Sequence, residues 1–367
     1  MKKILMVVIV VGGLGMFFLI NSFSDEISNS QSEFSSGSKA NSIFENYKAS
    51  GADCTKVKDI LIRGDCFQEV NDKYLEWYLD QSKRDFDFSF QQEQNHWKDI
   101  FYYEISPEDH LEELVETEHN LDDEDTFPSG DSNYQRGIET VQEYWYVFSN
   151  MIPVEYRESL KSVYWTDTGE DFVLGIGRDE ENLEDTLFMI SHNVGEYHPL
   201  IKATLIHEFG HVLTLGEQQV SIDEEVYLSE EEDVWKEAEE ACSTYFVSYG
   251  WGCVDESSYL FAYYQQFWDD IFNEFVQIDW AAERDYEDFF FHHEERFFNS
   301  YQGTNPEEDI AEAFTFFIMM DRTEVEEGSE MKYEKIRFFY QYDELVALRT
   351  RILENIYNLS VENGEFY

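Results

Sequence analysis

Residues 205–219, "LIHEFGHVLTLGEQQ", place two histidines and a glutamate within one of the most apolar stretches of the chain. The apolar residues surround them at helical spacing, so the sequence predicts a buried helix over about residues 198–215. His207 and His211 are four residues apart and share one helix face, where Cβ atoms lie about 5–6 Å from each other. Glu208 adds a carboxylate, and burying an unpaired carboxylate costs several kcal/mol. Either these residues hold a metal ion, or the helix contains a hydrogen-bonded pair of core histidines.

The chemistry of these side chains favours the metal. Two imidazoles with one open coordination position suit zinc, and H-E-x-x-H is the arrangement that zinc peptidases use. Glu208 lies beside the metal in this arrangement, where it takes a proton from a metal-activated water and passes it to a leaving amine. We therefore expect one Zn²⁺ ion, with His207 and His211 as ligands and Glu208 as the catalytic general base.

A catalytic zinc also needs a third protein ligand. The metzincin continuation would require glycine at position 214 and histidine at 217, but the chain has Thr214 and Glu217. The ligand must then come from elsewhere, and the segment 304–320, "TNPEEDIAEAFTFFIMM", predicts a second buried helix. Asn305 is a good N-cap and Pro306 suits the first helical position.

Two glutamates on this second helix are candidates for the third ligand. Glu312 is the only charge between the first turn and Asp321, and we rank it first. Glu308 lies one turn earlier on the same face and ranks second, because a capping box with Asn305 already explains it. Asp309 could orient a ligand histidine from behind. A salt-bridged Glu312 at the surface stays open as the alternative.

Other residues are further candidates. Glu239 and Glu240 lie on an amphipathic helical segment that could supply a ligand. His292 and His293 are adjacent, so we expect their side chains to point to different faces and at most one to reach the site. Tyr301, shortly before the second helix, is a candidate catalytic residue that would donate a hydrogen bond to the oxyanion of the reaction.

"HEFGH" and the distant "NPEEDIAEAF" together resemble the gluzincin zinc metallopeptidases. The chain looks most similar to uncharacterised exported bacterial peptidases that are distantly similar to the catalytic domain of anthrax lethal factor. The resemblance covers roughly residues 133–320 and implies that the glutamate of A-E-x-F, here Glu312, is the third zinc ligand. It also implies a small sheet, an active-site helix and a helical lower half.

The order of the predicted elements gives the same fold class. A helix over "YQRGIETVQEYWYVFSNM" (134–151) precedes three short runs that read as strands, "SVYWTD", "DFVLGIG" and "TLFMIS". We expect these strands to be antiparallel and linked by hairpins. The sequence predicts an α+β fold, with a small mostly antiparallel sheet packed on the H-E-x-x-H helix and a largely helical C-terminal half.

Four regions are predicted along the chain. Residues 1–21 carry two lysines before an apolar run, which is typical of a signal peptide or an N-terminal membrane anchor. Residues 22–42 are rich in Ser and Asn and predict a flexible tether. Residues 43–130 form an acidic, mainly helical region, with helical spacing in "VNDKYLEWYLDQ" and "PEDHLEELVETEH". Residues 131–367 form the zinc metallopeptidase domain.

The cysteines and the charge bear on location and partners. The exported start and an even cysteine count indicate disulfides, and near spacing favours the pairs Cys54–Cys66 and Cys242–Cys253 among three possible connectivities. The net charge is −54, with 79 acidic against 25 basic residues, so we expect no nucleic-acid partner. A solvated acidic face and a preference for cationic substrates both stay open as explanations of this charge.

These observations predict a zinc metallopeptidase that acts outside the cytoplasm, either secreted or held at the membrane by its N-terminal segment alone. Its partner would be a peptide or protein substrate, and the sequence leaves the oligomeric state open. Two alternatives remain: a non-enzymatic surface protein, in which these residues bind zinc only to hold the fold or bind nothing, and a zinc hydrolase that cleaves cell-wall amide bonds. A fourth protein ligand, such as His292 or His293, would favour the first alternative.

Overall fold

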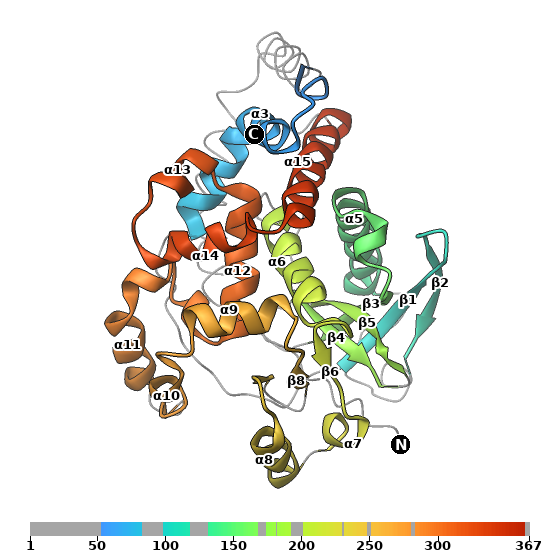
Figure 1. Cartoon of the computed structure of the whole chain (residues 1–367). Coiled ribbons are helices and arrows are strands. Elements are labelled where there is room, and N and C mark those ends of the chain that lie inside the picture. The colour runs from blue at the N-terminus through green and yellow to red at the C-terminus, as the bar shows by residue number, and fades with distance from the viewer. Residues whose placement is uncertain are drawn as a thin grey trace.

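The computed structural model of the chain describes residues 53–82, 98–117, 131–167, 174–180, 182–191, 201–229, 231–247, 251–279 and 283–363. Figure 1 shows a sheet on one side of the molecule and a helical half on the other, with helix α6 (Ile201–Thr214) between them. This helix contacts both the sheet strand β4 (Leu174–Asp179) and helix α12 (Pro306–Met319). The α+β prediction is confirmed in this coarse form.

In the described part of the chain, the main sheet has five strands, in the spatial order β2 (Leu111–Glu116), β1 (Lys98–Ile105), β3 (Leu160–Asp167), β5 (Asn182–Ser191) and β4. Three of its four strand pairs are antiparallel, as predicted. β3 and β5 pair in parallel, however, and β4 follows β3 in the chain without pairing with it. The prediction of hairpins throughout is therefore wrong at this point, whereas β4 and β5 do form an antiparallel hairpin.

Helix α5 (Ser132–Met151) covers this sheet and agrees with the predicted helix. Asp131 caps it by accepting a hydrogen bond from the backbone of Asn133. Its buried face includes Val141, Tyr144 and Phe148, and the Phe148 ring stacks on Phe188 of β5 at 5.4 Å. Aromatic packing of this kind fixes the sheet against its helical layer.

Residues 98–116 form two strands, in a region that was predicted to be mainly helical. Helical spacing was expected in "PEDHLEELVETEH", but β2 occupies its centre and pairs antiparallel with β1. β1 in turn pairs with β3, so residues on both sides of the expected boundary near 130 share one sheet. The described part of residues 43–130 also includes helix α3 (Ile60–Ser82), which agrees with the helical spacing of "VNDKYLEWYLDQ".

The helical half surrounds α12, all of whose residues are buried. The C-terminal helix α15 (Asp343–Asn363) packs along α3, as Figure 1 shows. The other helices among the described residues are α7 (Glu224–Tyr227), α8 (Glu232–Ala241), α9 (Tyr259–Phe267), α10 (Phe272–Phe275), α11 (Glu283–His292), α13 (Arg322–Glu327) and α14 (Met331–Phe339), with the 3₁₀ turns η1 (Val154–Tyr156), η2 (Glu294–Arg296) and η3 (Tyr301–Gly303). A second, antiparallel sheet has the order β6 (Val220–Ser221), β8 (Gly252–Val254), β7 (Phe246–Val247).

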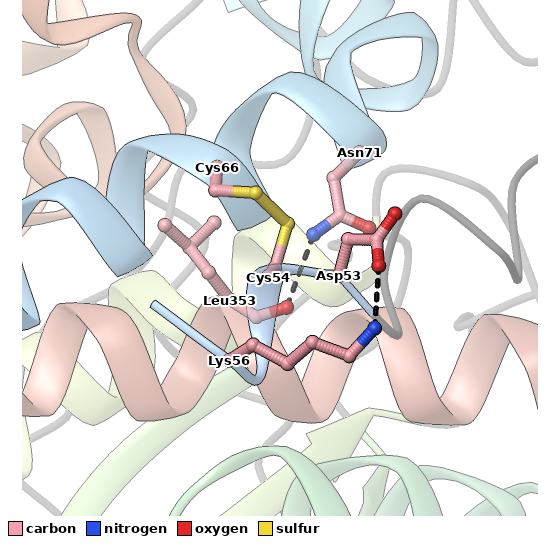
Figure 2. Close-up of a disulfide and its surroundings, with 6 residues drawn as sticks. All are labelled: Asp53, Cys54, Lys56, Cys66, Asn71 and Leu353. Carbon is pink, nitrogen blue, oxygen red and sulfur yellow. Dashed lines mark hydrogen bonds and ion pairs between the residues drawn. A yellow bond between two sulfur atoms is a disulfide. The ribbon is translucent and has the colours of Figure 1, made fainter. Parts of the chain in front are cut away.

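Both predicted disulfides are present. Cys54 pairs with Cys66, with Cα atoms 5.5 Å apart, and Cys242 pairs with Cys253, with Cα atoms 5.7 Å apart. Figure 2 shows the first disulfide beside α15, where the Asn71 amide donates a hydrogen bond to the Leu353 carbonyl at 3.0 Å. Two disulfides fit an extracellular protein, because such bonds persist in oxidising surroundings.

Among the described residues, no helix is both long and apolar enough to cross a membrane. The predicted signal peptide or anchor (1–21) and the predicted tether (22–42) lie outside the described residues.

Candidate metal centre

Helix α6 is buried along nearly its whole length, as its apolar sequence predicts. It lies against α12 with little space between the backbones: a Cβ added at Gly210 would lie 3.0 Å from the Cα of Ala311. One turn of each helix therefore contacts the other almost directly, and Phe209 packs on Phe314 with ring centroids 5.8 Å apart. This close approach brings the polar face of α12 to the histidines of α6.

The start of α12 confirms one half of the predicted capping box. Asn305 accepts a hydrogen bond from the backbone nitrogen of Glu308 at 2.8 Å, and Pro306 occupies the first turn. The other half is wrong, because the Glu308 side chain turns away from the cap and faces the histidines of α6. The Glu308 side chain therefore does not cap the helix, and capping was the reason for ranking it second among the ligand candidates.

Three side-chain atoms converge between the two helices. Nε2 of His207 lies 3.0 Å from Oε2 of Glu308 and 3.1 Å from Nε2 of His211, which lies 3.4 Å from the same Glu308 oxygen. Ligand atoms of a tetrahedral zinc lie about 3.3 Å from each other, given bonds of about 2.0–2.1 Å. His207, His211 and Glu308 are buried and could hold a metal ion.

Glu312 contacts the opposite nitrogen of the same imidazole. Its Oε1 lies 3.0 Å from Nδ1 of His207, and its Oε2 accepts a hydrogen bond from the Asn299 amide at 3.1 Å. The structure thus brings Glu312 to the centre but behind a histidine, while Glu308 meets the converging atoms. If Nδ1 donates to Glu312, the imidazole is in the tautomer whose Nε2 presents its lone pair to a metal ion.

In this tautomer, a cation bound at Nε2 would separate two electron-rich atoms. With the His207 proton on Nδ1, the lone pair of Nε2 faces a carboxylate oxygen of Glu308 at hydrogen-bond distance. Without a metal, the alternative is a buried imidazolium that donates to both glutamates. Burial opposes that charge, yet Glu308 and Glu312 raise the pKa of His207 well above its usual value. A proton and a metal ion therefore compete for the same atom.

The balance of charge in the centre also favours a divalent ion. Glu208, Glu308 and Glu312 are all buried, and the partners described for the last two are imidazole, amide and phenol groups, none with a fixed positive charge. Burial alone would raise the pKa of Glu308, but His211 and His207 lower it to about 2. An anionic Glu308 in this buried centre is compensated either by protonated histidines or by a bound metal ion.

Glu208 is fully buried, and neither of its carboxylate oxygens has a hydrogen-bond partner among the described residues. Buried polar atoms without partners are rare in proteins and indicate a missing ion, water or reactant. Burial raises the pKa of Glu208 well above its usual value, with further increases from Glu308 and Glu312. A carboxylate with a raised pKa accepts a proton more readily, as a general base must.

Tyr301 lies at this centre, as expected. Its ring centroid is 5.8 Å from that of His207, and burial together with a hydrogen bond to Glu308 raises the pKa of its hydroxyl well above the usual value. The hydroxyl therefore keeps its proton and can donate a hydrogen bond in this site.

Asp309 differs from its predicted role. It points away from the histidines to Lys335, whose Nζ lies 2.6 Å from Oδ2, and it accepts a hydrogen bond from the Trp268 indole at 2.7 Å. Both charged side chains are fully buried. The pair anchors α12 to α14 and to the end of α9, so it holds the helix on which Glu308 and Glu312 lie.

The remaining candidates lie elsewhere. Glu239 and Glu240 are exposed on α8. His292 and His293 both contact Glu274, so the expectation that their side chains diverge is wrong: the imidazole rings are stacked at 4.5 Å. Asn299 was not predicted, because a single asparagine in a loop carries no sequence signal. Glu308 did carry a signal, its one-turn spacing from Glu312.

In comparisons with protein-family models, curated proteins and solved structures, the chain has no significant match. The resemblance to gluzincin peptidases therefore rests on the motif residues alone.

Proposed function

We propose that this protein is a zinc-dependent metallopeptidase. The observation that supports it most directly is the convergence of His207 Nε2, His211 Nε2 and Glu308 Oε2 within 3.0–3.4 Å, beside the unpartnered carboxylate of Glu208. Two imidazoles and one carboxylate are a frequent ligand set of catalytic zinc, which leaves a position for water or substrate. We assign Glu308 as the third ligand and Glu312 as the residue that orients His207.

Each residue of the site would have a separate role in the reaction. Glu208 would accept a proton from the attacking water and deliver it to the amine that leaves. Tyr301, which keeps its proton, would donate a hydrogen bond toward the oxyanion. Glu312 and Asn299 would hold the imidazole of His207 in one tautomer and orientation. A zinc ion bound at these ligands would supply Lewis acidity toward water and toward the substrate carbonyl.

The contacts of His292 and His293 support an open site. A closed zinc site would need a fourth protein ligand, and the two histidines considered for that role contact Glu274 instead. The two disulfides support a location outside the cytoplasm, and we propose that the enzyme acts there. The resemblance to exported gluzincin peptidases fits the same proposal.

Glu208→Gln tests the function. The variant should retain zinc, because Glu208 is not a ligand, while turnover falls by about 10²–10⁴-fold, the usual share of a general base. The protein is incubated with a denatured protein mixture, and new peptide termini are counted by mass spectrometry. Glu217→Gln is the matched control, since Glu217 is exposed near the end of the same segment.

Three outcomes are informative. Termini produced by wild type and Glu217→Gln but not by Glu208→Gln would support a peptidase. Equal products from Glu208→Gln and wild type would contradict the proposed mechanism. Release of amines from peptidoglycan, without any cleavage of protein, would move the assignment to the cell-wall amide hydrolase.

A further inference from the structure

A second group of metal-binding side chains lies on the surface, between α10 and the end of α11. Nδ1 of His292 lies 2.9 Å from Oε1 of Glu274, and Nε2 of His293 lies 3.2 Å from Oε2 of the same carboxylate. One ligand atom from each residue lies within 4.8 Å of the other two. This group is separate from the centre described above, which α6 and α12 form.

The backbone that carries these residues is held by an aromatic cluster beneath it. Phe275, next to Glu274, packs on Trp268 at 5.3 Å and on Phe289 at 5.7 Å between ring centroids. Phe289 in turn contacts the ring of His293 at 5.0 Å. The backbone that carries the three ligands is therefore already held in place by packing, so metal binding would not require a flexible loop to become ordered.

The arrangement is open on the side of the solvent. The His292 side chain is 68% exposed and Glu274 is 47% exposed, whereas His293 is only 11% exposed. An ion could enter directly from solution and keep water molecules as its remaining ligands. The buried His293 would fix the position of the ion, and the exposed side chains of His292 and Glu274 would complete its protein ligands.

We propose that Glu274, His292 and His293 form a second metal site, which takes a divalent transition metal such as zinc. Two imidazole nitrogens and one carboxylate oxygen suit zinc, copper or nickel, whereas calcium and magnesium prefer oxygen ligands alone. The stacked rings, 4.5 Å apart at 29°, present two nitrogens to one carboxylate.

The site is tested by counting bound zinc. The full chain is stripped with a chelator, dialysed against Zn²⁺ and analysed for metal by mass spectrometry. Wild type should bind two zinc ions per chain. The double variant His292→Asn/His293→Gln should bind one, because each amide replaces an imidazole nitrogen as hydrogen-bond donor to Glu274 but is a poor zinc ligand.

Two controls make the result specific. His110→Asn removes an exposed histidine from another part of the surface and should still bind two ions. His211→Gln should lose the ion of the buried centre and keep the one at Glu274, which separates this proposal from the proposed function. Equal zinc content in wild type and in the folded double variant, with unchanged metal-free melting temperature, would overturn the second site.

Discussion

At the scale of single residues, Glu308 and Glu312 show how one helix turn separates two roles. Both lie on the inner face of α12, and both contact His207, but they contact different nitrogens. Nε2 is the atom that meets His211, so Glu308 is the proposed ligand, whereas Glu312 would act through the imidazole. Removing a ligand should cost more than removing the group that orients one.

The two glutamates should therefore differ when each is replaced by glutamine. Glu312→Gln should weaken zinc affinity by about 10–100-fold, the usual effect of losing such a partner. Glu308→Gln should weaken it further, because a charged ligand is lost from the ion itself. Competition with a chromogenic chelator measures both affinities. The reverse order would restore Glu312 as the third ligand.

The H-E-x-x-H residues could be predicted because their spacing alone brings them together on a helix. Glu308 was ranked second because a local rule, the capping box, seemed to account for it. The structure satisfies only the backbone half of that rule. Which carboxylate reaches Nε2 depends on how α12 is rotated against α6, and that rotation comes from packing at Gly210 and Ala311, which no spacing within one helix reveals.

At the scale of elements, the buried pair of Asp309 and Lys335 holds α12 in that rotation. Both side chains are fully buried, and burial lowers the pKa of Lys335 to about 8 in spite of its partner. Lys335→Met should lower the free energy of unfolding by about 3–5 kcal/mol, because it leaves Asp309 buried without a counter-charge. Urea denaturation followed by circular dichroism measures the loss.

A second variant separates charge from packing at this pair. Asp309→Asn/Lys335→Met removes both charges and keeps an acceptor for the Trp268 indole. It should recover most of the lost stability, since paired replacement of a buried ion pair is often neutral. A double variant as unstable as Lys335→Met would mean that the volume of the lysine, and not its charge, supports α12.

The sheet shows which elements the sequence specifies. The runs that became β3, β4 and β5 are rich in β-branched and aromatic residues, and they were recognised. β2 was not, because none of its side chains is fully buried and its few apolar residues also fit helical spacing. The parallel pairing of β3 with β5 depends on contacts between distant segments, which local patterns do not specify.

At the scale of the whole molecule, the two disulfides hold different parts of the fold. Cys242–Cys253 closes the segment that carries Tyr245, whose hydroxyl donates to both oxygens of Glu307 at 2.9 and 3.0 Å. Glu307 is adjacent to the proposed ligand Glu308. Cys54–Cys66 instead holds the start of α3 beside α15, as Figure 2 shows.

Removing either disulfide should lower the stability of the fold by a similar amount, but only one of the two removals should also weaken zinc binding. The pairs are 12 and 11 residues apart, so replacement of each by serines should destabilise the fold by about 3 kcal/mol. Only Cys242→Ser/Cys253→Ser should also lower zinc affinity, through the freed Tyr245. Cys54→Ser/Cys66→Ser is the matched control. Equal zinc affinity in both double variants would show that the Tyr245–Glu307 contact does not support the centre.

The net charge of −54 acts on the molecule as a whole. Like charges spread over one surface destabilise the compact state through mutual repulsion, and salt screens this repulsion. The Debye length falls from about 30 Å at 0.01 M to about 3 Å at 1 M ionic strength. The melting temperature should therefore rise with NaCl over this range.

This measurement needs controls for two other effects of added solute. Sucrose at the same osmolality shows the effect of an uncharged solute, and a chelator in every sample removes any contribution from bound metal. A rise with NaCl that exceeds the rise with sucrose would come from screening. Salt also weakens attractive ion pairs such as Arg63–Glu354 and Arg322–Asp65. A melting temperature that falls with NaCl would therefore mean that these attractive pairs contribute more to stability than the repulsion among the acidic residues takes away.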